Sequence, residues 1–402
     1  MSLISKRLKL IKPSPTLAVV QKAAQLKKEG RKIISLGAGE PDFDTPENIK
    51  IAAIEGIKNG FTKYTNVDGM PLLKEAIQAK FKRENRLEYS LNEIIASCGG
   101  KQVIYNLFMA SLDPEDEVII PAPYWVSYPD IVSLAGGIPV FVNCEITDHF
   151  KLKASYLKQH ITTKTKWLIL NSPSNPTGAA YSKEELLDIA TMLRAYPNIY
   201  ILSDDIYEHI IYDDFKFYSL VEIAPDLRDR VFIINGVSKS YSMTGWRIGY
   251  GAGPSDLIKA MTTIQSQSTS NPTSISQIAA IEALNGPQDY VKINAANFQA
   301  KRDLAIAILT STQDIECFIP QGAFYLFPKC SNIFGSRSSQ GIMIENSTVF
   351  AQYLLDEEGI AVVPGIAFGL EGYFRISYAA SLIEIEEACT KIVQATKRLK
   401  RD

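Results

Sequence analysis

Lys239 is the side chain of this sequence best placed for covalent chemistry. It follows an apolar run, Val231–Ile234, typical of a strand buried on both faces, and a turn signal at Asn235-Gly236. Arg247 comes shortly after it, before a second apolar run, and is expected on the strand that returns from the lysine loop. Burial and nearby positive charge lower the pKa of a lysine, so its neutral amine can attack a carbonyl carbon. Most lysines at strand ends are exposed instead, so the neighbours decide between the two interpretations.

Two earlier apolar runs also end in polar side chains. Trp167–Leu170 is followed by Asn175, and Ile199–Leu202 is followed by Asp204 and Tyr207. In an open α/β sheet, ligands bind in the crevice beyond the carboxyl ends of the strands. We therefore expect one site at this edge of a sheet. The side chains expected there are Asn175, Asp204, Tyr207, Lys239 and Arg247.

A strand, a glycine turn and a helix follow one another from Ile94. Ile94–Cys98 is a short apolar strand, Gly99-Gly100 is a turn, and an amphipathic helix begins at Lys101. Unpaired N–H groups at the start of such a helix bind anions. The GxxxxGK[ST] spacing of a nucleotide-binding loop is absent, so the pattern favours one small phosphate. The next strand leads to an aromatic side chain, Trp125.

The elements that position these residues alternate between short strands and helices through about Leu309, which predicts a mostly parallel α/β sheet. Ser14 is expected to cap a first helix that shares Leu17, Val20 and Ala24 on one face. After Pro320 the pattern changes to that of a smaller α/β unit. The Gly- and Ser-rich segment 329–346 is expected to be a mobile loop.

Bulk composition is that of an ordinary globular protein. Lys and Arg number 42 against 44 acidic residues, which gives a net charge of -2 and does not favour nucleic acid or an anionic membrane. Neither a signal peptide nor a membrane-spanning run is apparent, and five scattered cysteines suggest a reducing cytoplasm. Three histidines without a cysteine cluster argue against a zinc site, so no metal is expected. Pro41 and the missing third glycine after Gly37-Ala-Gly39 exclude a dinucleotide fingerprint.

Five motifs in order resemble the class I pyridoxal-phosphate-dependent aminotransferases, and within them the bacterial aspartate aminotransferase subgroup. The resemblance runs from about Lys12 to the C-terminal helix. The motifs are Ala38–Phe43, Asn171–Gly178, Ser203–Tyr207, Ser238-Lys239 and Gly245–Gly249. The resemblance implies the α/β fold of fold-type I transferases, with a mixed, mostly parallel seven-stranded sheet in a large domain and a smaller α/β domain. The implied division is an N-terminal arm with part of the small domain (1–45), a cofactor-binding domain (46–315) and a C-terminal small domain (316–402).

The resemblance also implies roles around pyridoxal 5'-phosphate. Lys239 matches the lysine that holds the cofactor as a Schiff base and later moves the substrate α-proton. Asp204 matches the carboxylate that keeps the pyridine nitrogen protonated, so that the ring acts as an electron sink. Asn175 and Tyr207 match residues that bind the ring oxygen, with Tyr207 counted among the catalytic residues. Trp125 matches the aromatic residue that stacks on the ring.

The phosphate and the partner subunit form the next implied set. Arg247 would clamp the phosphate with two hydrogen bonds, and Gly100, Lys101 and Ser238 would add further donors. Tyr64 resembles a tyrosine that reaches the phosphate of the partner subunit, which implies a homodimer with shared sites. One departure from the family is Gly236, because a serine is common there and its hydroxyl contact is missing here.

The implied substrate contacts involve two carboxylates. Arg375 matches the arginine that binds the α-carboxylate, with Gly39 offering its backbone and Asn175 and Trp125 also touching substrate. No arginine lies in Thr262–Pro272, where some aspartate enzymes bind the distal carboxylate, so Lys101 is assigned that role. Lys12 and Ser14 are candidate helpers, although Ser14 is also explained by helix capping.

We therefore expect an aspartate aminotransferase that exchanges amino groups between L-aspartate and 2-oxoglutarate by a ping-pong mechanism. Alternatives on the same cofactor are an aminotransferase for prephenate, aromatic amino acids or alanine, or a lyase. A more distant alternative is a non-catalytic, ligand-binding regulator built on this fold. The absence of an appended DNA-binding segment weighs against the regulator, and small amino and keto acids are the expected partners.

Overall fold

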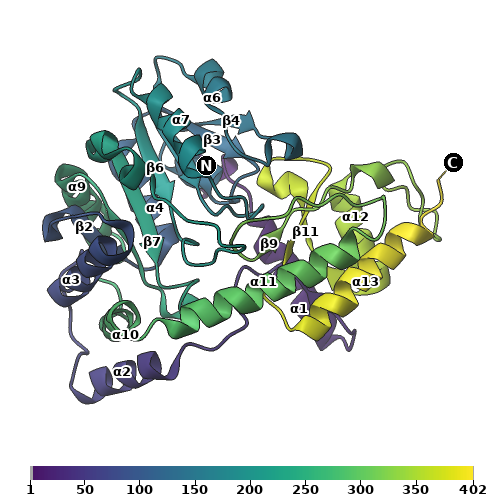
Figure 1. Cartoon of the computed structure of the whole chain (residues 1–402), viewed down its shortest axis with the longest axis horizontal. Helices are drawn as coiled ribbons and strands as arrows, with labels where there is room; N and C mark the ends of the chain where they lie inside the picture. Colours follow the sequence, from purple (N-terminus) through teal and green to yellow (C-terminus); the bar gives the residue numbers. More distant parts are fainter. Residues whose placement is uncertain (1–2, 402) are drawn as a thin grey trace.

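A mixed seven-stranded sheet forms the centre of the larger part of the molecule, in the order β2–β8–β7–β6–β5–β3–β4 (Figure 1). The computed structural model describes residues 3–401. Strand β8 runs antiparallel to β2 and β7, and the other neighbours are parallel. The strands are β2 (Ile94–Ser97), β3 (Glu117–Ala122), β4 (Ile138–Asn143), β5 (Thr165–Asn171), β6 (Tyr200–Asp204), β7 (Val231–Gly236) and β8 (Gly249–Ala252). The predicted sheet and its mostly parallel character are confirmed.

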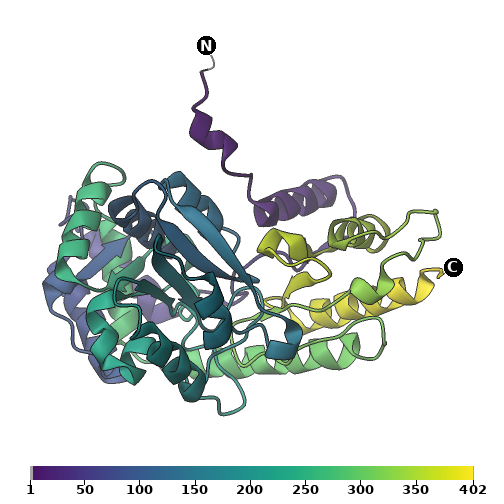
Figure 2. The same ribbon diagram turned by 90° about the horizontal axis from the view of Figure 1, so that it is seen from above.

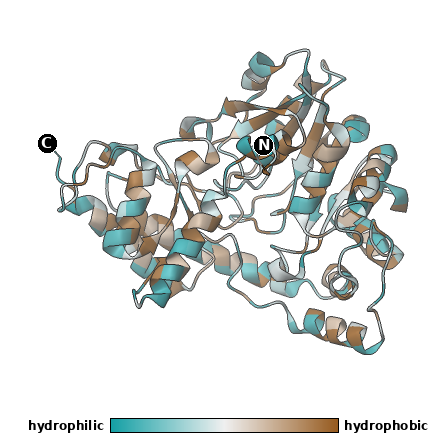
Figure 3. Cartoon of the chain, turned by 180° about the vertical axis from the view of Figure 1, so that it is seen from behind, coloured by the Kyte–Doolittle hydropathy of each residue, from teal (hydrophilic) through white to brown (hydrophobic). Residues whose placement is uncertain are grey.

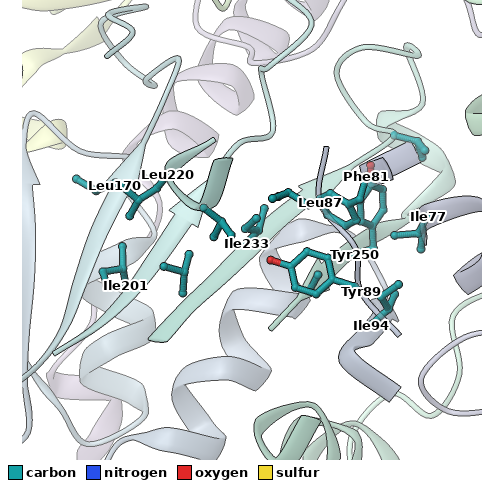
Figure 4. Close-up of a cluster of buried hydrophobic side chains, with 14 of the residues drawn as sticks. Ile77, Phe81, Leu87, Tyr89, Ile94, Leu170, Ile201, Leu220, Ile233 and Tyr250 are labelled. Atoms are coloured by element: carbon teal, nitrogen blue, oxygen red, sulfur yellow. The ribbon is translucent and has the colours of Figure 1, made fainter. Parts of the chain in front are cut away.

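Both faces of this sheet are covered by helices, as the near-continuous apolar runs require. Side chains alternate between two cores, so Ile233 joins one cluster while Phe232 and Ile234 join the other. Figure 4 shows part of the first cluster, in which Ile201 and Ile233 lie among aliphatic and aromatic neighbours. The helices in this part are α2 (Glu47–Lys58), α3 (Pro71–Lys80), α4 (Gly100–Ser111), α5 (Tyr128–Leu134), α6 (Ala154–His160), α7 (Lys183–Leu193), α8 (Leu220–Ile223), α9 (Ser255–Ser266) and α10 (Ser274–Asn285).

The smaller unit holds an apolar core of its own. Its strands are β1 (Ile34–Ser35) paired with β10 (Ile360–Ala361), and β9 (Tyr325–Leu326), β11 (Val363–Pro364) and β12 (Phe374–Ser377) in a second small sheet. Its helices are α1 (Pro15–Lys28), α12 (Ser347–Tyr353) and α13 (Leu382–Arg398). The long helix α11 (Asp289–Leu309) connects the two parts in Figure 1, and its Phe298 and Leu309 belong to the smaller core. The division at residues 45 and 315 stays a prediction.

Three local expectations are corrected. Helix α1 begins after Ser14 as predicted, but it buries Ala23 and Leu26 while Leu17 is exposed, because the small domain covers the neighbouring face. Strand β7 continues through Gly236, so the turn begins later than the Asn-Gly pair indicated. Arg247 does not lie on the returning strand; it ends a short 3-10 turn just before β8.

The segment 329–346 contains no α-helix, as expected of a loop, but it is held at several points. Ile333 and Ile344 are fully buried, and the Gly335 N–H donates to the Ile344 carbonyl at 2.9 Å. Arg337 also exchanges backbone hydrogen bonds with Lys400 beyond α13. These contacts restrict any large motion to the tip of the segment, so the expectation of a mobile loop is wrong for its two stems.

The N-terminal segment projects away from the body before α1 packs against the smaller unit (Figure 2). Figure 3 shows apolar residues concentrated on the strands, while the helices carry polar residues on one side. Within residues 3–401, no helix combines the length and the apolar character that crossing a membrane requires.

Candidate active site

A cavity of about 300 Å³ opens at the carboxyl ends of the central strands, where the sequence predicted a site. Loops after β2, β3, β5, β6 and β7 reach it, as do β12 and the start of α1. It is lined by four basic side chains and one carboxylate, which favours a ligand with several negative charges. Those charged residues are Lys101, Lys239, Arg247, Arg375 and Asp204.

The Lys239 amine points into this cavity from the loop after β7. Its Nζ donates a hydrogen bond to the Gly39 carbonyl oxygen at 2.6 Å. Burial lowers the pKa of Lys239 to about 8, helped by the positive charges of Arg247 and Arg375 and opposed by Glu40. The lowered pKa increases the fraction of neutral amine near neutral pH, which is the form that a nucleophile or a proton acceptor requires.

Asp204, at the end of β6, is the only carboxylate among the described residues that line the cavity. Its Oδ2 accepts a hydrogen bond from the Tyr128 hydroxyl at 2.5 Å, and its Oδ1 accepts one from the Ile206 N–H at 3.3 Å. Burial raises the pKa of Asp204 to about 6, although both hydrogen bonds act in the opposite direction. A cationic ring nitrogen beside this carboxylate would reverse that shift, because a buried anion is stabilised by an opposite charge.

Arg375 on β12 is a buried cation without a carboxylate partner within residues 3–401, since the groups to which it donates hydrogen bonds are neutral. Its Nη1 donates to Asn175 Oδ1 at 3.0 Å and its Nη2 to the Gly37 carbonyl at 2.5 Å, while its Nε has no hydrogen-bond partner in the part of the chain that the structure describes. The guanidinium carbon lies 4.7 Å and 4.9 Å from the ring centres of Tyr325 and Phe368. An unpaired buried N–H of a charged group indicates a site for an anion.

Tyr207 lies next to this arginine and is fully enclosed. Its hydroxyl and that of Tyr325 are 2.8 Å apart. Burial raises the pKa of Tyr207, and the neighbouring Tyr325 adds to that shift. Tyr207 is therefore a neutral hydrogen-bonding group at neutral pH, able to donate to an oxygen of a ligand.

The glycine turn before α4 forms a close-fitting wall beside Arg247. Gly99 has a φ of +87°, and a Cβ at this position would collide with the Arg247 guanidinium. Arg247 itself has a left-handed φ of 58°, and its Nη1 donates to the Thr244 carbonyl at 2.8 Å. Strained non-glycine backbone of this kind concentrates at ligand-binding sites. The guanidinium, the N–H groups that begin α4 and Ser238 together offer donors of the kind that a phosphate requires.

Gly236 has little room for the serine common in the family. A Cβ there would lie 3.1 Å from Gly249 Cα and 3.2 Å from Ile206 Cδ1. The close packing of β7 against β8 in this chain therefore leaves little space for a serine side chain, whose hydroxyl would contact the phosphate in other members of the family.

Lys101 and Trp125 occupy the outer part of the cavity. The Lys101 Nζ lies 5.0 Å from the centre of the Trp125 ring, a cation–π distance. Burial lowers the pKa of Lys101, and the nearby Arg247 adds to the shift. Ser14 caps α1 by accepting from the Leu17 N–H at 3.4 Å and also lines the cavity, so the two interpretations of Ser14 are compatible. Exposed Lys12 lines only the adjoining groove that Lys101 and Ser14 share.

Besides Lys12, which reaches only the adjoining groove, Tyr64 is the predicted site residue that the chain does not bring to this cavity. Its side chain is 92% exposed and lies outside the cavity lining. The sequence analysis in turn missed Tyr128 and Tyr325. Tyr128 follows the Pro-rich strand end that drew attention to Trp125, and Tyr325 lies in a predicted strand, so their positions were visible but their contacts with Asp204 and Tyr207 were not.

The residues present fit pyridoxal phosphate. Arg247 and the glycine turn offer a phosphate cradle, the lone acid Asp204 suits a ring nitrogen, and the Lys239 amine suits an aldehyde. The partnerless Nε of Arg375 leaves a donor for a further carboxylate. Fold and cavity together define an α/β enzyme with a reactive lysine and an anion-binding active site.

The comparisons give the family. The sequence pattern described as "Aminotransferase class I and II" matches residues 31–392, and the chain belongs to this family, whose members are transaminases that use pyridoxal phosphate. The "Probable aspartate/prephenate aminotransferase" of Rickettsia felis is 69% identical over 395 residues, which cover 98% of this chain and 97% of that protein.

Two solved structures share the whole fold. The aspartate aminotransferase of Rhizobium meliloti superposes with a TM-score of 0.96 at 49% identity, covering 100% of both chains. The aspartate aminotransferase of Thermus thermophilus, solved with maleate, gives 0.92 at 40% identity over 98% of this chain and 100% of the other. The predicted family, fold class and cofactor are confirmed.

Proposed function

We propose that this enzyme is an aspartate aminotransferase, which transfers the amino group of L-aspartate to 2-oxoglutarate and gives oxaloacetate and L-glutamate. The carrying observation is a pair of cations, Arg375 and Lys101, in one cavity with the reactive Lys239. Both substrates carry two carboxylates, and each carboxylate needs a positive partner once it is desolvated. The relatives named aspartate aminotransferases support this choice.

The proposed roles follow from the groups that each residue offers. Arg375 binds the α-carboxylate through its free Nε, and Gly39 and Asn175 orient the substrate beside it. Lys101 binds the distal carboxylate at the cavity mouth, close to Trp125, and Lys12 and Ser14 lie next to it in the adjoining groove. Arg247, Ser238 and the Gly100 N–H hold the cofactor phosphate, and Trp125 covers the ring.

Proton movement is assigned to Lys239 and Asp204. When bound, pyridoxal phosphate supplies an electron sink that stabilises negative charge at the substrate Cα. Lys239, with its pKa lowered to about 8 by burial, would take the proton from Cα and return it to the carbon on the other side of the amino nitrogen. Asp204 keeps a proton on the ring nitrogen, and the Tyr128 hydroxyl holds the carboxylate in position. Tyr207 donates to the ring oxygen.

We also propose a homodimer in the cytoplasm. Tyr64 is exposed on its own chain, and Ile51, Ile54 and Ile57 form an exposed apolar stripe on α2 that a partner would cover. A tyrosine donated across this interface would complete the phosphate site of the other chain. The five cysteines are unpaired, as expected in a reducing compartment.

Prephenate is a second candidate substrate, because close relatives are named aspartate/prephenate aminotransferases. Prephenate also has two carboxylates, so the same two cations suit it. A panel of amino donors with 2-oxoglutarate and prephenate as acceptors, read by the new amino acid formed, tests the proposal. The proposal predicts the highest kcat/KM with aspartate; a preference for alanine or an aromatic donor would contradict it.

A further inference from the structure

A buried polar network lies beneath the Lys239 loop, on the side away from the cavity. It consists of side chains that neither the cofactor site nor the substrate site uses. Lys80 at the end of α3 is 0% exposed and Glu208 is 5% exposed, and the Lys80 ammonium lies 5.1 Å from the ring centre of Phe81, a member of the first apolar core. Figure 4 shows part of that core, including Phe81 and Tyr250. Buried charges of this kind are costly unless they are fully paired, so the arrangement calls for a role. The other members of the network are Glu84, Asn85, His209, Asn235 and Ser240.

The Glu208 carboxylate is fully satisfied. Its Oε1 accepts hydrogen bonds from the Lys80 ammonium and from Asn235 Nδ2, the latter at 2.6 Å. Its Oε2 accepts from Asn85 Nδ2 at 2.8 Å. Burial alone would raise the pKa of Glu208, but the Lys80 charge and these hydrogen bonds hold it below its ordinary value. Glu208 is therefore a fixed anion, directly after Tyr207 in the chain.

Two hydrogen bonds connect this network to the loop that carries Lys239. Asn235 Oδ1 accepts from the Gly236 N–H at 2.7 Å, where β7 ends and the loop begins. His209 Nδ1 lies 3.1 Å from Ser240 Oγ, and Ser240 directly follows Lys239. The loop is therefore held on both sides of Lys239 by contacts that lead back to Glu208 and His209, the two residues that follow Tyr207 in the chain.

The same place could be mistaken for a metal site. Ligand atoms of Glu84, Glu208 and His209 lie within 4.8 Å of one another. The Lys80 ammonium contacts Glu208 and lies 3.6 Å from Glu84 Oε2, so it already supplies the positive charge. His209 Nε2 lies 2.9 Å from the same Glu84 oxygen. The lysine takes the place that a bound cation would have.

We propose that Glu208 and His209 are positioning residues that hold the Lys239 loop from below, with Lys80 as their built-in counter-cation. Glu208 acts through Asn235 on the start of the loop, and His209 acts through Ser240 on its far side. A displacement of about 1 Å in a reacting group can lower a rate by roughly a hundredfold. The inference rests on the proposed role of Lys239.

A matched pair of substitutions at His209 separates positioning from mere packing. The amide of His209→Asn falls near the Nδ1 position and keeps the Ser240 hydrogen bond, whereas His209→Gln reaches the Nε2 position and keeps only the Glu84 contact. We expect His209→Gln and Ser240→Ala each to lower kcat by roughly tenfold with KM nearly unchanged. We expect His209→Asn to stay close to the wild type.

Two further measurements complete the test. The second readout is the rate at which added pyridoxal phosphate becomes attached to Lys239 in cofactor-free protein, measured by peptide mass after reduction. This rate should fall in His209→Gln and Ser240→Ala and stay close to that of the wild type in His209→Asn. The double variant His209→Gln/Ser240→Ala should be no slower than either single variant, because both substitutions remove the same hydrogen bond between these two side chains. Asn235→Ala should slow attachment independently.

Equal kcat values for His209→Gln and His209→Asn, or a Ser240→Ala variant with wild-type kcat and attachment rate, would overturn the inference. A wild-type protein that attaches the cofactor at another lysine would instead overturn the proposed function. Thermal unfolding of each variant identifies general loss of structure, and Ser240→Ala, a small change on a loop, keeps the test valid if the histidine variants unfold.

Discussion

In our proposal Arg375 and Lys101 bind the two ends of the substrate, and the structure supports these two roles to different degrees. Arg375 is buried, has a fixed orientation between Tyr325 and Phe368, and lacks a carboxylate partner in the described chain. Lys101 is more exposed and rests against Trp125. The first is a general amino-acid contact, and only the second distinguishes dicarboxylic substrates from others.

Substitution of Lys101 therefore tests substrate choice. Lys101→Ala should lower kcat/KM for aspartate and for 2-oxoglutarate. The loss should correspond to about 2–4 kcal/mol of activation free energy, the cost of leaving a desolvated carboxylate unpaired. Steady-state kinetics with aromatic and monocarboxylic amino acids should change much less. Lys259→Ala, an exposed helical lysine outside this cavity, is the matched control. Equal losses for both groups of substrates would mean that Lys101 serves only the phosphate loop.

At this scale the sequence was most informative where a motif and a strand end coincide. Asn175, Asp204, Lys239 and Arg375 all reach the predicted cavity. Tyr128 was missed because its role depends on a hydrogen bond between the turn after β3 and the end of β6, far apart in sequence. No local pattern encodes such a contact.

The end of strand β6 places two acids, Asp204 and Asp205, in buried positions, and this has a consequence for stability. Burial raises the pKa of Asp204 from 3.8 to about 6 and that of Asp205 from 3.8 to about 7, the latter helped by the charge of Glu208. Between pH 4 and pH 7 the folded state keeps protons that the unfolded state has released. The cofactor-free protein should therefore lose stability as the pH rises through this window.

For Asp204 alone the loss is roughly 3 kcal/mol, from about 1.4 kcal/mol per pKa unit. Thermal or denaturant unfolding of the cofactor-free protein from pH 4 to pH 8 measures it. Asp205→Asn should flatten the pH dependence, because one of the two titrations is removed. An unfolding free energy that increases over this window would contradict the assignment.

Helices and strands were predicted best where the spacing of apolar residues agrees with the turn and capping residues that mark the ends of the element. An amphipathic helix was predicted to begin at Lys101, and helix α4 begins at Gly100 and buries Val103 and Leu107. Helix α1 was predicted with the wrong face, because its burial is set by packing against β1, β10 and Leu355 rather than by its own weak apolar pattern. The segment 329–346 was expected to be mobile because its Gly and Ser content hides the two buried isoleucines that hold it.

The whole molecule, in our account, works as a pair of chains. Each chain brings its own Lys239, Asp204, Arg247 and Arg375 into one cavity. Its Tyr64 is exposed outside that cavity. The buried glutamine Gln277 supports that presentation, because it binds the Met70 N–H at 2.7 Å and the Thr65 hydroxyl at 2.9 Å. A rigid loop with an exposed tyrosine is suited to a neighbouring subunit.

Hybrid dimers test this assembly. Tyr64→Phe should weaken phosphate binding in the partner's site, and Lys239→Ala should abolish turnover by several orders of magnitude in its own site. Mixing and refolding two inactive variants, Tyr64→Ala and Lys239→Ala, should restore part of the activity, because some hybrids contain one intact site. Full activity of a monomer in sedimentation, or no recovery in mixtures with verified exchange, would exclude a shared site.

The most direct measurement concerns Lys239 itself. The protein loaded with pyridoxal phosphate is reduced with borohydride, digested, and its peptides are weighed and sequenced by mass spectrometry. Our account predicts one modified peptide, carrying the cofactor on Lys239, and protection of that lysine by prior conversion with aspartate. Recovery of the label on any other lysine, or labelling that aspartate does not affect, would contradict the central claim.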